Sequence, residues 1–413
     1  MPESPAASGL RNAGAARLTG GRLALLASLA ALGALATNIL LPAFPQIAQD
    51  LGVNVQELAL SLTVFFAVFA IGQLFVGPLS DAIGRKPFVL GGLAVFGLGS
   101  LVCAFAESLP VLIAGRALQA AGACAASVLA RAIARDLYHG AELTRALALV
   151  MIAMAAAPGF SPALGTLMTA TLGWRSVFVL VAVVAGIVAL CYRGGVGETL
   201  APASRRSAHP GSTIRTYFGL ARDARFIAPA LAVSFVIGCL YSFFGAAPAI
   251  FLNSMQISAT GLSLFFAMTV FVVFGSGLLA SPLARRFSAA RTGMAGVLLT
   301  LASGLWLLAQ GGAPSPVPFM AAITLFLAGM GLVNPIGTAI ALEPFGDRAG
   351  AASALLGFLQ MGCAALGTVL VASIRLAPAT SFAWIVACAA TLASLMFAIA
   401  IRSELSAKRL ARP

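Results

Sequence analysis

The chain has 413 residues and a formal net charge of +13, with 60% of its residues hydrophobic and only 9% charged. Soluble domains carry roughly 25% charged residues, so this composition excludes soluble enzymes, nucleic-acid-binding proteins and disulfide-rich secreted modules. The length instead accommodates about twelve spans of roughly 20 apolar residues each, which favours a polytopic membrane protein.

Apolar runs predict an all-α membrane protein with twelve transmembrane helices in two six-helix bundles. A hydrophilic stretch rich in arginine, glycine, serine and proline divides the spans six and six. The expected segments are therefore a tail (1–21), a bundle (22–192), a cytoplasmic linker (193–225), a second bundle (226–402) and a second tail (403–413). The predicted spans are 23–42, 58–78, 88–106, 110–130, 146–170, 175–192, 227–251, 260–281, 293–310, 318–341, 351–373 and 380–401.

The placement of basic residues predicts the orientation. All but three of the 25 basic residues, the exceptions being Arg116, Arg175 and Arg375, fall on the side of both termini. By the positive-inside bias, that side is the cytoplasm, so the positive charge needs no nucleic-acid partner. The partners we expect are the lipid bilayer and a small-molecule cargo, and the expected state is a monomer.

No catalytic or metal chemistry is predicted. The six cysteines all lie in apolar spans without the C-x2-C spacing of zinc sites, and the chain has only two histidines. These residues build neither a metal cluster nor a histidine-based nucleophile system. We therefore expect no cofactor, no metal and no enzymatic activity.

The hydrophilic loop after the second predicted span carries candidate gating residues. Asp81 lies at a helix end, where its carboxylate could accept hydrogen bonds from Arg131 or Arg135 or sit at the positive N-terminus of another helix. Such a contact would lock the bundles in an outward-facing state. The alternative is a charged turn that only orients the second span. The remaining members are Gly77 and Gly84, expected to allow close backbone approach, and Arg85 and Lys86, expected to fix topology.

Arg116 is the most informative single residue, because it lies about 9 Å into the predicted fourth span. An arginine facing lipid at that depth costs several kcal/mol, so we expect it to face the cavity, with Gln119 on the same helix face. The alternative is snorkelling to the interface. Asn38 in the first span lies at a similar depth, so the sequence predicts a shared polar layer.

Other polar or aromatic residues in apolar spans are candidate cavity residues. Tyr241 and Phe244 are three residues apart and predict a ring-lined helix face. Asn334 and Gln360 are isolated polar side chains, which could equally be interhelical hydrogen-bond partners.

Proline and glycine cluster in the fifth span, at Pro158, Pro162 and Gly165. Such a cluster bends a helix and thins its surface. We expect the bend to close the interface between the bundles against leak.

None of the twelve acidic residues is predicted near the middle of a span. Glu343, at the end of the tenth span, is the best remaining candidate for a proton site, although its edge position suits a plain interfacial role equally well. A cavity with Arg116 and no nearby acid lacks a counter-charge for cations, so neutral or anionic amphiphiles are the predicted substrates.

Several segments carry a resemblance to a known family. The loop of residues 77–86 resembles the signature loop of the major facilitator superfamily. Further segments resemble the bicyclomycin and chloramphenicol resistance group of drug:proton antiporters within it, namely residues 41–45, 116–119, 131–136, 161–165, 173–175 and 349–355.

The resemblance implies two six-helix bundles, alternating access around a central cavity, and export of small hydrophobic drugs in exchange for protons. It also implies a coupling role for Arg116 and an antiporter motif around Pro158, Pro162 and Gly165, where Thr166 replaces a further glycine. Asn38 stands where the group commonly carries an aspartate, and an amide cannot titrate.

The sequence thus predicts an inner-membrane exporter of amphenicol-like or bicyclomycin-like drugs. Two alternatives stay open: an uncoupled facilitator or metabolite exporter or importer on the same fold, and a transport-dead membrane scaffold or sensor. The direction of net flux separates the first alternative, and a partner-binding surface would be needed for the second.

Overall fold

The computed structural model describes residues 19–200, 205, 210–311 and 315–410. Within these ranges the chain is helical, without a strand, and twelve helical segments are long and apolar enough to cross a membrane. The predicted all-α membrane fold is therefore confirmed. Residues 1–18 of the predicted N-terminal tail lie outside the described residues.

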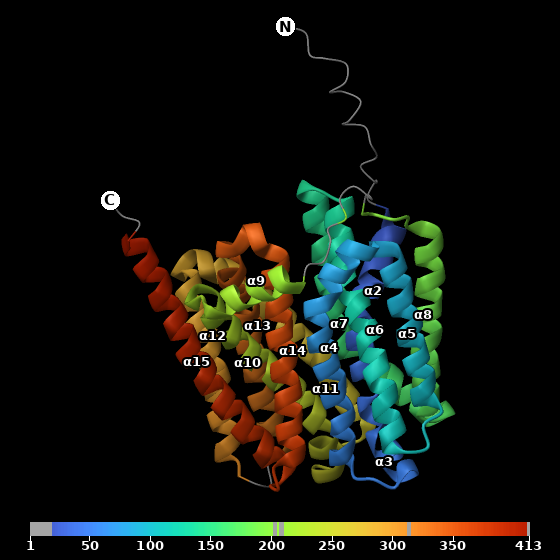
Figure 1. Cartoon of the computed structure of the whole chain (residues 1–413). Coiled ribbons are helices and arrows are strands. Elements are labelled where there is room, and N and C mark those ends of the chain that lie inside the picture. The colour runs from blue at the N-terminus through green and yellow to red at the C-terminus, as the bar shows by residue number, and fades with distance from the viewer. Residues whose placement is uncertain (1–18, 201–204, 206–209, 312–314, 411–413) are drawn as a thin grey trace.

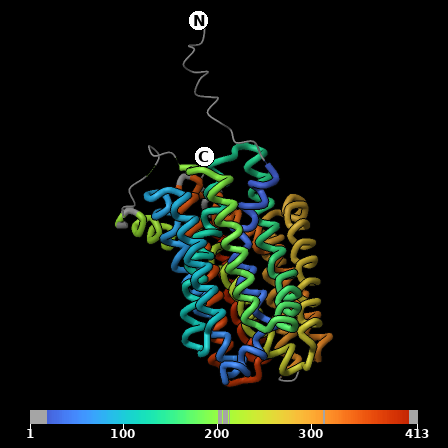
Figure 2. Tube along the Cα trace, turned by 90° about the vertical axis from the view of Figure 1, so that its right-hand side faces the viewer, coloured from blue at the N-terminus to red at the C-terminus, as the bar shows by residue number. Residues whose placement is uncertain are grey.

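The long helices run side by side between two ends of the molecule (Figures 1 and 2). We call the end near both chain termini the linker end and the opposite end the far end. The first helix group occupies one side in Figure 1 and the second group the other. The first group comprises α2 (Gly20–Asn38), η1 (Leu41–Ala43), α3 (Phe44–Leu51), α4 (Val55–Ile83), α5 (Arg85–Ala104), α6 (Leu109–Leu137), α7 (Gly140–Leu172) and α8 (Arg175–Gly195).

The second helix group follows a short helix, α9 (Pro210–Arg222), which lies within the predicted linker. A linker read from composition alone missed this helix, because helix α9 is amphipathic and short rather than apolar. The second group comprises α10 (Ala224–Ala247), η3 (Pro248–Ser254), α11 (Ala259–Phe287), α12 (Ala289–Ala309), α13 (Pro316–Leu342), η4 (Glu343–Arg348), α14 (Ala349–Ser373) and α15 (Pro378–Leu410).

Two ends of the predicted segments differ from the structure for local reasons. The first span continues past its predicted end at 42, because η1 and α3 carry the helical path on to Leu51. Pro42 and Pro45, each near the start of one of these short helices, interrupt the long helix there. At the other end of the chain α15 extends to Leu410, into the predicted tail.

Local sequence signals set several helix ends. A capping box starts α4, in which the Glu57 carboxylate accepts a hydrogen bond of 2.9 Å from the backbone N–H of Asn54. The same helix stops at Gly84, whose φ of 113° is unfavourable for residues with a Cβ. Gly173, with a φ of 79°, ends α7 in the same way.

Two helix pairs form most of the boundary between the groups: α4 packs along α14, and α7 packs along α11. Lipid chains are as apolar as leucine, so close packing holds membrane helices together and small residues favour it. Gly357 of α14 lies against Gln73 of α4, and Gly159 of α7 lies against Val270 of α11. A Cβ at Gly159 would overlap the branched Val270 side chain, whereas at Gly357 it would meet the amide end of the flexible Gln73 side chain.

Candidate functional site

A hydrogen-bonded polar network lies inside the first helix group. Arg116 of α6 is fully buried and donates a hydrogen bond of 3.0 Å to the backbone carbonyl of Ala36 in α2. It also donates to the side-chain oxygen of Gln119. Gln119 in turn donates a hydrogen bond of 2.8 Å to the hydroxyl of Ser100 in α5. Three helices thus hold one guanidinium, which lies inside the group instead of facing an open cavity as predicted.

Several polar atoms of this region have no hydrogen-bond partner among the described residues: Nε and Nη2 of Arg116 and Oδ1 of Asn38. The Asn38 amide nitrogen donates to the Ala34 carbonyl at 2.9 Å, inside its own helix. Asn38 lies two residues after Ala36, whose carbonyl Arg116 contacts. The described structure shows no direct hydrogen bond between the Asn38 and Arg116 side chains. A buried donor or acceptor without a partner costs about 1–3 kcal/mol, so these atoms carry an unmet hydrogen-bonding requirement in this state.

Aromatic rings connect this polar layer to the second helix group. The Arg116 guanidinium carbon lies 4.4 Å from the centre of the Phe65 ring, in a cation–π contact. Phe65 contacts Phe66 edge-on, with 6.0 Å between ring centres. Phe66 crosses to the second group, where its ring centre lies 4.7 Å from that of Tyr241. Tyr241 packs edge-on against Phe244 at 5.5 Å. We call these four rings the aromatic junction.

The junction places Tyr241 and Phe244 on one helix face, as their spacing predicts. Sequence reasoning missed Phe65 and Phe66, because phenylalanines in an apolar span give no signal that separates packing from function. The Tyr241 hydroxyl makes no hydrogen bond that the described structure records, so the junction presents one polar atom among apolar rings.

Two hydroxyl pairs join the helix groups toward the far end. Thr63 of α4 donates a hydrogen bond of 2.9 Å to Thr368 of α14. Thr166 of α7 and Ser263 of α11 share a hydrogen bond of 2.8 Å. Each hydroxyl lies roughly 6–12 Å from the far end of its helix, at 1.5 Å per residue. We call the two helix pairs at the boundary, α4–α14 and α7–α11, the seams. Each seam carries one hydroxyl pair, and these two pairs close the far end.

The proline and glycine cluster of α7 contributes to this closed region. Pro158 and Pro162 lie inside α7, which continues unbroken to Leu172. Gly165 packs so closely on the end of α2 that a Cβ would collide with the Ile39 carbonyl. Thr166 stands where the antiporter motif has a further glycine. Its hydroxyl makes the hydrogen bond to Ser263, which a glycine could not make.

The gating loop at the linker end forms ion pairs within its own group. Asp81 pairs with Arg85 at 2.6 Å, and Arg85 also contacts Asp136 of α6 at 3.1 Å. The expected partner of Asp81 was Arg131 or Arg135, and the structure corrects this. The Arg131 guanidinium instead lies 3.7 Å from the Met154 sulfur, while Arg135 is exposed in the last turn of α6.

Glu198 is a member of this loop cluster that sequence reasoning missed. Its carboxylate accepts hydrogen bonds from the backbone N–H groups of Arg85, at 2.9 Å, and Lys86, at 3.2 Å, at the start of α5. Partial burial raises the pKa of Glu198, but hydrogen bonds from backbone N–H groups and the charge of Arg205 outweigh it, so the pKa is lowered. The available signal was that Glu198 is one of only two carboxylates in a basic linker.

The two glycines of the gating loop, Gly77 and Gly84, differ in how closely other residues approach them. A Cβ on Gly84 would lie 2.5 Å from a Glu198 oxygen, so this glycine allows the capping contact as predicted. Around Gly77 nothing lies within 4 Å of a Cβ position, so the close approach expected there is wrong. Lys86 donates a hydrogen bond of 3.1 Å to the Arg193 carbonyl at the end of α8.

The remaining predicted residues are placed but not joined to the network. Asn334 of α13 and Gln360 of α14 are half-buried. Glu343 is exposed at the start of η4 and, with Pro335, lines a pocket of about 220 Å³ between α11, α12 and α13. Gln73 of α4 is buried at the α4–α14 seam. Like Gln360, it is a polar residue in an apolar span, so the same reasoning makes it a candidate.

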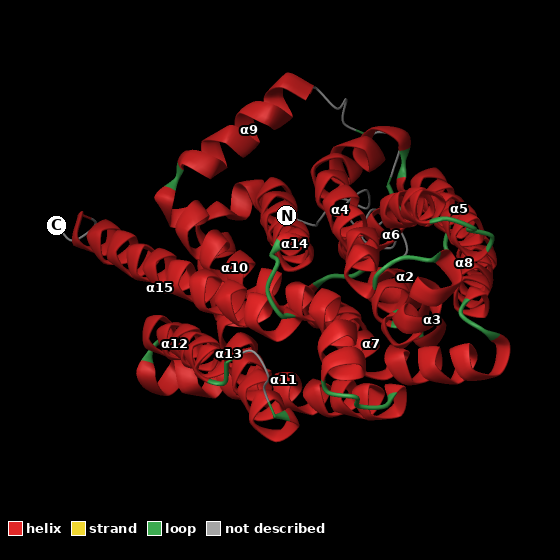
Figure 3. Cartoon of the chain, turned by 90° about the horizontal axis from the view of Figure 1, so that it is seen from below, coloured by secondary structure: helices red, strands yellow, loops and turns green. Residues whose placement is uncertain are grey.

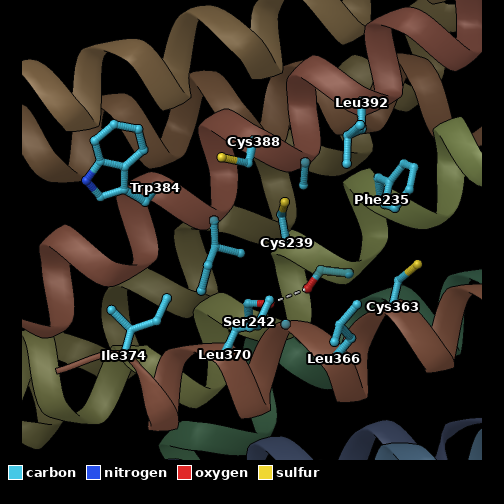
Figure 4. A pocket seen from close by; sticks show the side chains of 14 residues that line it. Phe235, Cys239, Ser242, Cys363, Leu366, Leu370, Ile374, Trp384, Cys388 and Leu392 are labelled. Carbon is cyan, nitrogen blue, oxygen red and sulfur yellow. Dashed lines mark hydrogen bonds between the residues drawn. The ribbon is translucent and has the colours of Figure 1, made fainter. Parts of the chain in front are cut away.

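An apolar groove of about 250 Å³ lies between α10, α14 and α15, on the outside of the second group (Figure 4). Leu366 and Trp384, each more than half exposed, form its rim. Ser242 lines it but donates its hydroxyl to the Gly238 carbonyl of its own helix. Ligand sites need polar groups that fix orientation, so the aromatic junction is the better candidate site.

Comparison with known proteins identifies the family. Residues 26–368 match the family model of the Major Facilitator Superfamily. The chain is 31% identical over 340 residues to the uncharacterized MFS-type transporter YdgK of Bacillus subtilis, covering 82% of this chain and 85% of that one. It is 28% identical over 405 residues to a chloramphenicol resistance protein of Pseudomonas aeruginosa, covering 93% and 91%.

Among solved structures, the D-xylose-proton symporter aligns with a TM-score of 0.71 over 91% of this chain and 96% of that one, at 14% identity. This likeness shows the fold alone. The predicted resemblance to the bicyclomycin and chloramphenicol resistance group is confirmed by the relatives. The protein is a multi-pass membrane protein, and it belongs to the Major Facilitator Superfamily.

Proposed function

We propose that this protein is a secondary transporter, not an enzyme, that exports small hydrophobic drugs across the bacterial inner membrane. The relatives include proteins named for multidrug and chloramphenicol resistance, which supports drug efflux as the class of activity. The observation that carries the proposal is the position of Arg116, fully buried and stacked on a ring of the aromatic junction.

The residues of the junction favour a substrate of defined chemistry. Rings supply apolar contact area, while the unpartnered Arg116 nitrogens are donors that only an acceptor can satisfy. Asn38 contributes an amide and no charge. Substrates with an apolar body and an acceptor group, neutral or anionic, are therefore preferred over cations, which would find no carboxylate in this part of the described structure.

Alternating access is the proposed transport cycle, with the two helix groups rocking about the α4–α14 and α7–α11 seams. The state described here is closed at the far end by the two hydroxyl pairs. Asp81 pairs within its own group, which agrees with a lock that is broken when the linker end opens. We place the linker end in the cytoplasm, from the charge distribution, and take the monomer as the working unit.

Proton coupling is part of the proposal, and Glu343 is its candidate carboxylate. It lines a pocket between three helices of the second group at the linker end. Export without proton exchange is the second candidate function, and Asn38 favours it, because an amide occupies the position where the related group carries an acid.

The test is drug accumulation in an efflux-deficient bacterial host that expresses the chain, with chloramphenicol and ethidium as probes and with or without a protonophore. We expect chloramphenicol accumulation to fall, the protonophore to restore it, and ethidium accumulation to change little. Ethidium export that survives Arg116→Ala but is lost in Asn38→Ala would contradict the substrate preference.

Variants separate the junction from the lipid-facing groove. Tyr241→Ala should abolish chloramphenicol export, whereas Trp384→Ala, also an aromatic truncation, should leave it intact. Glu343→Gln should remove the protonophore effect. Export that ignores the protonophore in the unchanged protein establishes the uncoupled alternative, and unchanged accumulation of both probes overturns drug export.

A further inference from the structure

Helix α9 (Pro210–Arg222) has two faces with different surroundings. It lies across the other helices near the linker end, at the rim of the molecule rather than over its centre (Figures 1 and 3). One face packs on the molecule: Leu220 is buried in a cluster that includes Phe226 of α10 and Phe345 of η4. This face fixes α9 to the second helix group.

The outer face of α9 combines apolar and basic side chains. Ile214 and Phe218, four residues apart, are 65% and 55% exposed. Arg215 and Arg222 are also exposed, and the Arg222 guanidinium carbon lies 4.0 Å from the centre of the Phe218 ring. At 100° per residue these four side chains occupy one continuous arc, with the apolar pair along one edge and the arginines along the other. The described face carries no acidic residue.

Tyr217 connects α9 to the first helix group at a backbone carbonyl that lacks its usual donor within the helix. Its hydroxyl donates a hydrogen bond of 2.9 Å to the backbone carbonyl of Leu74 in α4. In an uninterrupted helix that carbonyl would accept from the N–H of residue 78, but residue 78 is proline and has no N–H. Pro78 therefore frees an acceptor that Tyr217 takes up, and the bond fixes which face of α9 points outward.

We propose that α9 is a lipid-binding strap, whose outer face docks on anionic phospholipid in the leaflet at the linker end. Ile214 and Phe218 enter the acyl region, while Arg215 and Arg222 contact lipid phosphates. The strap bridges both helix groups, since Leu220 holds it to the second group and Tyr217 to the first.

Three features select the bilayer as the occupant of this face. The helices that α9 crosses, α10 and α14, are membrane spans, so the rim of the molecule near their ends faces lipid. A helix with apolar and basic edges lies naturally in the plane of the interface. The charge of the outer face is complementary to anionic headgroups, each arginine contributing about a fivefold gain in affinity near the surface.

The first test measures lipid preference of the full chain. The purified protein is titrated with phosphatidylglycerol and, separately, phosphatidylcholine in detergent, and bound lipid is counted by native mass spectrometry. We expect a preference for phosphatidylglycerol that falls about 25-fold in the double variant Arg215→Gln/Arg222→Gln.

A matched control removes the same charge elsewhere. Arg145 and Arg291 are exposed residues near the linker ends of α7 and α12. Arg145→Gln/Arg291→Gln should keep the lipid preference. An equal loss in both double variants, or no loss in either, overturns the proposal, and the latter outcome would make an acidic protein partner the next candidate.

The second test addresses the strap. Tyr217→Phe should lower the phosphatidylglycerol preference about fivefold, the equivalent of one hydrogen bond, because α9 then loses its fixed rotation. Pro78→Ala should act similarly, since it supplies an N–H that competes for the Leu74 carbonyl. The double variant should match either single variant; additive losses, or a preference unchanged by Tyr217→Phe, would refute the role of this bond.

Discussion

The first helix group buries a charged residue, Arg116, whereas the second group buries a set of phenylalanines around Phe243. Phe243 contacts five other rings, with centres 5.6–6.4 Å away. The charged group leaves donors unpartnered, while the ring cluster has no polar requirement. The first group therefore holds a buried charge with unpartnered donors, whereas the second is held together by apolar ring packing, so substitutions in the two regions should act differently.

The largest expected effect follows from truncating the ring cluster. Phe243→Ala should lower the free energy of unfolding by about 3–5 kcal/mol, because the surrounding rings cannot fill the cavity. Phe271→Ala, at a position 66% exposed on α11, should change it by no more than about 0.5 kcal/mol. Denaturant unfolding in mixed micelles measures both. Near-equal effects would show that the cluster is not tightly packed.

The buried arginine should respond differently from a packing residue. Gln119→Leu removes an acceptor from Arg116 and should cost about 1–3 kcal/mol of unfolding free energy. Arg116→Met removes the charge itself, so stability should be unchanged or increase, while drug export is lost. Gln360→Leu is the control for a glutamine outside the network. A strongly destabilised Arg116→Met protein would mean that the guanidinium is a structural group.

Smaller effects, equal on the two sides, are expected from substitutions in the hydroxyl pairs of the two seams. Thr166→Val and Thr63→Val each remove one hydrogen bond between the groups, worth about 1 kcal/mol, and should speed hydrogen exchange of far-end segments about fivefold. Thr324→Val removes a bond within α13 and should have no such effect. Equal exchange in all three variants would exclude the hydroxyl pairs from closing the far end.

Much of this arrangement follows from the sequence. Twelve apolar runs predict the twelve spans, and the spacing of Tyr241 and Phe244 predicts their shared face. Asp81 shows the limit, because its partner depends on which of several nearby arginines the tertiary fold presents. The partner is Arg85, four residues away at the start of α5. Arg116 lies inside its group because a backbone carbonyl at Ala36 and the Phe65 ring receive it, and neither gives a sequence signal. Helix α9 could not be predicted from the apolar pattern, because its stability comes from packing against other helices and not from an apolar run.

The smallest expected effect concerns the loop at the linker end, whose ion pairs contrast with the hydroxyl pairs of the far end. The pKa of Glu198 is lowered in the folded protein, so its ionised form contributes stability above its ordinary value of 4.5. That contribution is lost as the pH falls through the lowered pKa. The stability difference between the unchanged protein and Glu198→Gln should therefore be constant near neutral pH and shrink below about pH 4.5. Unfolding measured from pH 7 to pH 3 tests this, and a difference independent of pH would show that Glu198 acts by hydrogen-bond geometry rather than charge at the start of α5.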